Sequence, residues 1–147
     1  MILFTYKLTG SPGWALATIA NERSEMKVPA SYLCDALRDF VDAVQSLFAT
    51  DSAQCMWEQE PGLVIWEFRR DGPNVTVKVY WDHDGESFVG TDDLLRFSEQ
   101  VDRELDGLLA AWSEDGYLKK WHYPFPNEAQ TKLRQGIQRE NERRTKQ

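Results

Sequence analysis

Residues 55–81, "CMWEQEPGLVIWEFRRDGPNVTVKVYW", predict two consecutive β-hairpins. Apolar and polar residues alternate along this stretch, and turn sequences interrupt it at Pro61-Gly62 and at Asp71–Asn74. A shift of one residue in either hairpin would scatter the apolar side chains over both faces, so their agreement favours this arrangement. The shared apolar face consists of Cys55, Trp57, Val64, Trp66, Phe68, Val77, Val79 and Trp81.

The two turns also predict a register. Centring the first turn on Pro61-Gly62 places Trp57 opposite Trp66, and the second turn pairs Arg70 with Val75. We expect the other face of these strands to be exposed to solvent or covered by a partner. Its polar side chains include Glu58, Glu60, Glu67 and Tyr80.

The N-terminal third predicts strands followed by a helix. Residues 2–9 and 14–21 show the two-residue period of half-buried strands, and residues 25–28 extend or follow the second of them. Pro29 and Ser31 are typical of a helix start, with Ser31 as the N-cap. The apolar stripe of that helix consists of Leu33, Leu37, Phe40, Val44 and Leu47.

The C-terminal third predicts two more helices. The first begins after residue 93 and ends near "SEDG", residues 113–116. Residues 117–126 are expected to be extended or irregular, because proline disfavours a helix at the residue before it. The last helix begins at Asn127, and we expect residues 138–147 to form a frayed basic tail.

Together these elements predict an α+β fold. The order ββ-α-βββ-α-α, with its strands joined as hairpins, implies a two-layer sandwich with a mainly antiparallel sheet. Two amphipathic helices are expected to cover the tryptophan-rich face, beside a C-terminal helix. The chain carries no internal repeat and no low-complexity linker, so we expect residues 1–147 to form a single domain.

The stretch 81–93, "WDHDGESFVGTDD", is similar to a calcium-binding loop, with carboxylates at template positions one, three, five and twelve: Asp82, Asp84, Glu86 and Asp93. Ser87 replaces the glycine that the sharp turn needs, and a predicted strand replaces the preceding helix. An acidic connection explains the stretch better. In it Thr91 is the N-cap, and Asp92 and Asp93 face the positive end of the following helix dipole.

No motif of a common enzyme class occurs in the chain. Cys34 and Cys55 fall at predicted buried positions, so we expect structural thiols of low reactivity. His83 and His122 have no ligand partners at metal-binding spacing. The glutamates of the polar sheet face could act as paired glycosidase carboxylates only in a cleft, which the sequence does not indicate. We therefore expect no catalysis, no metal and no cofactor.

Charge is distributed unevenly along the chain. The net charge of −7 combines −12 in residues 1–118 with +5 in residues 119–147. An acidic body repels nucleic acids and anionic membranes and attracts basic partners. The sequence contains neither a membrane-spanning apolar run nor the pattern of a secretory signal, so we expect a cytoplasmic protein.

A small, acidic, tryptophan-rich α+β protein of this kind resembles the bacterial immunity proteins of polymorphic-toxin systems. The resemblance implies an inhibitor, monomeric or weakly dimeric, that binds and neutralises a cognate toxin domain by occlusion. It transfers no residue roles, because it rests on size, charge and architecture rather than on a motif.

The sequence also predicts where a partner binds. The expected interface combines the acidic connection with the polar sheet face: Asp82, Asp84, Glu86, Asp92, Asp93, Glu58, Glu60, Glu67 and Tyr80. Two other functions stay open. One is a small metal-assisted hydrolase that uses residues 82–93, and the other is a homodimeric adaptor module.

Overall fold

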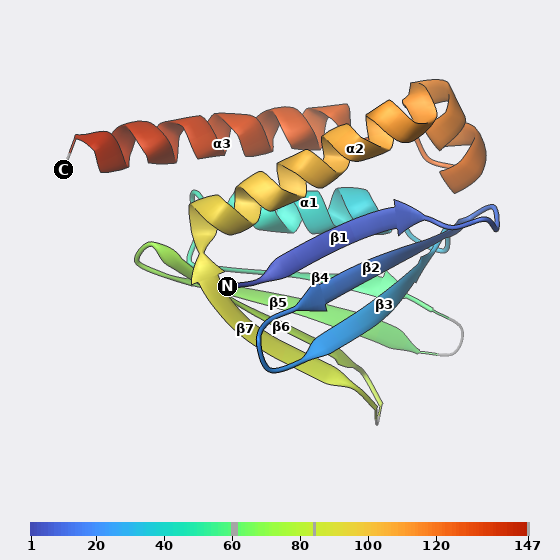
Figure 1. Cartoon of the computed structure of the whole chain (residues 1–147), viewed down its shortest axis with the longest axis horizontal. Coiled ribbons are helices and arrows are strands. Elements are labelled where there is room, and N and C mark those ends of the chain that lie inside the picture. Colours follow the sequence, from blue (N-terminus) through green and yellow to red (C-terminus); the bar gives the residue numbers. More distant parts are fainter. Residues whose placement is uncertain (60–61, 84, 147) are drawn as a thin grey trace.

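The computed structural model describes residues 1–59, 62–83 and 85–146 (Figure 1). Strands and helices alternate along them in blocks, in the order β1 (Leu3–Leu8), β2 (Trp14–Ala20), β3 (Glu25–Ser31), α1 (Ala36–Ser46), β4 (Ser52–Glu58), β5 (Leu63–Asp71), β6 (Asn74–Trp81), β7 (Ser87–Asp93), α2 (Leu94–Trp121) and α3 (Asn127–Thr145).

The fold is α+β, as the sequence predicts, but its strands form two antiparallel sheets. One has the order β1-β2-β3 and the other β4-β5-β6-β7. Figure 1 shows the three helices on one side of the molecule and both sheets on the other, with β1–β3 in front of β4–β7. The expected order ββ-α-βββ-α-α omits β7, and the sequence leaves open whether residues 25–28, which lie in β3, extend the second strand or follow it.

The second hairpin has the expected register, and the first is displaced by two residues. Arg70 pairs with Val75 as predicted, whereas Trp57 pairs with Val64 rather than with Trp66. The first turn closes earlier than expected, because the Gln59 N–H donates to the Gly62 carbonyl at 2.9 Å. A type II turn twists against the strands of a hairpin. A displacement of two residues preserves the faces, so the predicted apolar side is still the core side.

Strand β3 occupies the place where a helix start was expected. Pro29 pairs with Leu16, and Ser31 pairs with Trp14, so both lie in the sheet. The pairs on either side of Pro29 carry the ladder bonds, so its missing N–H faces away from β2, where proline is tolerated in a strand. Helix α1 therefore starts five residues after Ser31, at Ala36.

Strand β7 occupies most of the expected acidic connection. Phe88, Gly90 and Asp92 alternate into the interior, and residues 87–93 pair with β6. The buried aspartate and glycine conceal the strand period, since both residue types are rare in strands. Because the strand continues to Asp93, that residue caps α2 in place of Thr91. Its carboxylate accepts from the N–H groups of Leu95 and Arg96.

The C-terminal helices are longer than expected. Helix α2 breaks at Ser113 (φ 60°, ψ 171°), within the predicted "SEDG" end, but resumes and continues to Trp121. The Ser113 hydroxyl accepts from the Gly116 N–H and caps the second segment. The expected frayed tail from residue 138 is instead helical as far as Thr145, since Arg144 is paired with Asp93 and Glu140.

The core joins both sheets through α1. Phe40 of α1 stacks on Phe4 of β1 at a centroid distance of 4.8 Å and meets Trp66 of β5 edge-on at 4.9 Å. The predicted helix stripe is buried from Leu37 to Leu47, whereas Leu33 precedes α1 and is exposed. Buried apolar residues from both sheets and all three helices form one continuous cluster.

Strand β1 has a free edge, and side chains from α2 and its N-terminal junction cover it. The N–H groups of Ile2, Phe4 and Tyr6 donate in turn to Asp92 (2.8 Å), Gln100 (3.1 Å) and Glu104 (2.9 Å). Unpaired strand edges attract other chains, and natural folds cover them in this way.

Candidate functional site

Part of the predicted interface lies at one end of the four-stranded sheet. Glu58 pairs with Leu63, whose N–H donates to the Asp82 carboxylate at 3.0 Å. Asp82 also meets the His83 ring at 2.9 Å. The pKa of Asp82 is lowered by the Leu63 hydrogen bond and then by His83. Glu86 is exposed and precedes Ser87 at the start of β7.

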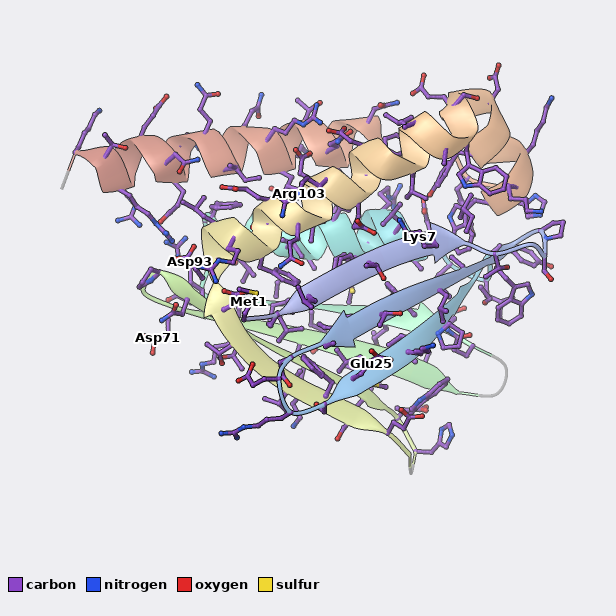
Figure 2. The ribbon with its side chains drawn as sticks, in the orientation of Figure 1. Met1, Lys7, Glu25, Asp71, Asp93 and Arg103 are labelled. Atoms are coloured by element: carbon purple, nitrogen blue, oxygen red, sulfur yellow. The ribbon has the colours of Figure 1, made fainter. Side chains whose placement is uncertain are left out.

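Asp92 and Asp93 lie at the other end of β7. Its seven residues span roughly 20 Å, so these two aspartates cannot share a surface patch with Asp82. Asp92 was expected at the interface, but its side chain is 4% exposed and binds the Ile2 N–H. Asp93 lies at the junction of β7 and α2 (Figure 2) and pairs with Arg144 at 2.8 Å.

Glu67 and Tyr80 lie together on the face of the four-stranded sheet that is turned away from the core. The Tyr80 hydroxyl donates to Glu67 at 2.7 Å, and this bond raises the pKa of Tyr80. Lys78 lies over the Tyr80 ring at 5.1 Å. The remaining two candidates, Glu60 and Asp84, lie outside the described residues.

The calcium-loop template does not form a loop. Strand β7 runs through it, so template positions one and twelve, Asp82 and Asp93, lie at opposite ends of the strand. Within residues 1–59, 62–83 and 85–146, no group of three or more His, Cys, Asp or Glu side chains is placed to hold a metal ion.

A groove of about 710 Å³ runs between α1 and the free edge of β4. Among the described residues that line it, three are carboxylates, and none is lysine or arginine. We call it the acidic groove and define it by Asp39 and Asp42 of α1 and Glu58 of β4. Leu63 also lines it, so the groove adjoins the sheet end that carries Asp82.

The two aspartates of the acidic groove are only weakly neutralised. Arg38 Nη2 lies 3.8 Å from Asp39, and its Nε lies 4.0 Å from Asp42, with all three side chains well exposed. Exposed pairs of this kind contribute little stability. Burial raises the pKa of Asp39, and Arg38 opposes that rise only in part. A cation that entered the groove would relieve this unfavourable charge.

Asp39 and Asp42 were not among the predicted site residues, and neither belongs to the apolar stripe of the predicted helix. Residues 35, 39, 42 and 46 follow steps of four and three, so they share one flank of the helix. That spacing could have predicted an acidic flank on the helix. It does not predict that β4 lies beside that flank.

The two cysteines also line the acidic groove. Cys34 was expected to be buried inside a helix, but it precedes α1 and is only partly buried. The Glu58 N–H donates to its sulfur at 3.4 Å. Burial raises the pKa of Cys34 and raises that of Cys55 much further. Both thiolates are therefore disfavoured, as expected for structural thiols.

Comparison with family models, curated proteins and solved structures found no match for this chain. Among the described residues, no helix has both the length and the apolar character that a bilayer crossing requires.

Proposed function

We propose that this protein is a cytoplasmic inhibitor that binds and neutralises a basic toxin domain, as bacterial immunity proteins do. The acidic groove carries the proposal. It combines a concave surface beside α1 with three carboxylates and no lining lysine or arginine among the described residues. Glu58 pairs with Leu63, whose N–H binds Asp82, so the groove adjoins the sheet end that also carries Asp82 and, directly before β7, Glu86.

Charge of this kind suits the capture of a toxin. Toxin domains that act on nucleic acids need basic active sites, because their substrates are polyanions. An acidic groove would attract such a site over a distance and raise the association rate, which can reach about 10⁸–10⁹ M⁻¹s⁻¹ at low salt. An inhibitor bound over the basic site would exclude the substrate.

The test uses the protein encoded by the adjacent reading frame, expressed with and without this protein. We expect that partner to arrest growth alone and to be neutralised by co-expression. Neutralising the acidic groove with Asp39→Asn, Asp42→Asn and Glu58→Gln together should slow association roughly tenfold at low salt. Stopped-flow measurements over a salt series would record both the rate and its salt dependence.

A matched triple variant carries the same change of charge elsewhere: Asp71→Asn, Asp115→Asn and Glu128→Gln. These side chains are exposed and lie outside the acidic groove. We expect this variant to associate at nearly the rate of the unmodified protein. Equal rates for both triple variants would overturn the proposal, as would a partner that is harmless or is not neutralised.

A further inference from the structure

Among the strands of the described residues, none pairs with one edge of β4. It is the first strand in the order β4-β5-β6-β7, so only one of its edges carries a ladder. The bonds from Arg70 N–H to Asp51 (2.7 Å) and from Gln59 N–H to Gly62 (2.9 Å) show that odd-numbered residues of β4 face β5. The backbone groups of Gln54 and Met56 therefore point outward, into the acidic groove.

Only parts of this edge are covered. The Cys34 sulfur meets the Glu58 N–H and the Met56 carbonyl, and the Thr50 hydroxyl donates to the Ser52 carbonyl. The described residues supply no partner for the Gln54 N–H, the Gln54 carbonyl or the Met56 N–H. On β1, by contrast, side chains accept from the outward N–H groups of Ile2, Phe4 and Tyr6. The fold covers one edge and leaves the other able to pair.

The negative charges beside this edge indicate what kind of strand would pair with it. Side chains of an added strand alternate between its two faces, so every second one would lie on the α1 side, beside Asp39 and Asp42. A second copy of this chain suits that position poorly. The β4 sequence, SAQCMWE, brings no cation, and two-fold pairing would bring both pairs of aspartates together.

We propose that β4 binds its partner by strand addition. An extended segment of the basic partner pairs with Gln54 and Met56, and lysine or arginine at alternate positions meets Asp39 and Asp42. Main-chain hydrogen bonds provide the affinity and the alternate cations provide the selectivity. This inference rests on the proposed function and specifies how the partner is held.

The first experiment uses an acetylated peptide of roughly eight residues that alternates lysine and threonine. NMR should show shifted and exchange-protected amides at Gln54 and Met56 on binding. In an added strand, all lysine N–H groups face one way and all threonine N–H groups the other. N-methylation of one residue type should therefore weaken binding at least about tenfold, and methylation of the other should change it little.

Two protein variants provide an independent readout. Gln54→Pro removes an N–H that does not bond to β5, whereas Gln54→Ala retains it and serves as the control. We expect the proline variant to lose peptide binding at least about tenfold relative to the alanine variant. If the proline variant does not fold, the methylated peptides still decide the outcome, because they leave the protein unchanged.

The possible failures are distinguishable. Peptide or partner binding that depends on Asp39 and Asp42 but tolerates every methylation would overturn strand addition and leave the proposed inhibitor intact. Dimerisation of the free protein that Gln54→Pro abolishes would assign the edge to a second copy and also overturn the inference. A partner whose capture ignores the groove carboxylates would overturn the proposed function itself.

Discussion

Glu140 is a buried carboxylate that three arginines surround. Its side chain is 5% exposed, and Arg70 Nη2 contacts both carboxylate oxygens at 3.0 and 3.1 Å, with Arg143 and Arg144 completing the cluster. Arg70 also donates to the Leu47 carbonyl at the end of α1. Through Arg70, Glu140 of α3 is connected to both β5 and the end of α1. Burial alone would raise the pKa of Glu140, but the arginine hydrogen bonds outweigh it and lower the pKa to about 2.

We expect Glu140→Gln to destabilise the protein by on the order of 3 kcal/mol at neutral pH, because Arg70 stays buried without a counter-charge. The pH dependence should change as well. A lowered folded-state pKa gives stability that is complete above the unfolded value of 4.5 and is lost as the pH falls towards 2. Urea unfolding between pH 2 and pH 7 would measure both effects.

The control is Glu142→Gln, which alters an exposed carboxylate on the same helix. Its stability should stay within about 0.5 kcal/mol of the unmodified protein at neutral pH, as for most surface changes. If both variants lost stability in parallel below pH 4.5, the buried cluster would not be the source of the acid sensitivity.

At the scale of elements, Gly136 sets how closely α3 approaches α1. A Cβ atom at this position would overlap the ring of Phe48, which follows α1. Alanine normally stabilises a helix relative to glycine by about 1 kcal/mol. Here we expect Gly136→Ala to destabilise the protein by about 1–3 kcal/mol, because the ring must move. Thermal unfolding would measure the change.

Gly107 in α2 is the matched control, because a Cβ atom there meets nothing within 4 Å. Gly107→Ala should stabilise the protein by about 0.5–1 kcal/mol, the ordinary helix preference. A gain of stability in both variants would show that α1 and α3 tolerate more separation than the packing indicates.

The covered edge of β1 gives a second prediction at this scale. Glu104→Leu removes the acceptor of the Tyr6 N–H and should cost about 1–3 kcal/mol. Glu104→Gln keeps an oxygen at the same place and loses only the partly exposed pair with Lys7, so its cost should stay below about 1 kcal/mol. Hydrogen exchange should show loss of protection at Tyr6 in the leucine variant alone, and equal exchange in both would refute this role of Glu104.

At the scale of the whole molecule, the two sheets share one core. Phe4, Phe40 and Trp66 join them through direct ring contacts. We therefore expect tryptophan fluorescence and far-ultraviolet circular dichroism to give coincident urea transitions, as for a two-state domain. Two separated transitions would mean that the sheets unfold independently.

Much of this architecture can be predicted from periodicity. Apolar and polar residues alternate around Trp66 and Val77, and this pattern predicts β5 and β6. A shift of one residue would turn their apolar side chains towards the solvent. Pro29 and Ser31 misled the prediction, since the same residues begin helices and fit the unpaired edge of a strand. Asp92 concealed β7 because its burial depends on the Ile2 N–H, which is 90 residues away.

The candidate site was predictable only in part. Glu58, Asp82 and Glu86 were identified from charge, and the structure places them at one end of a sheet. The acidic groove needs α1 beside the free edge of β4, and no local pattern specifies that distance. The charges along a sequence indicate which class of partner the protein attracts. The surface that binds the partner depends on tertiary packing, which those charges do not predict.

The covered edge of β1 also has a consequence for synthesis. Ile2, Phe4 and Tyr6 bond to side chains that follow them by 90 to 98 positions. At about 5–20 residues per second, a ribosome needs roughly 5–20 s after making the first strand to supply those side chains. Throughout that interval the emerging hairpin offers an uncovered edge to neighbouring nascent chains. Ribosomes that stall before α2 is made should therefore release truncated chains with an uncovered β1 edge. We expect chaperones to retain these chains or proteases to degrade them.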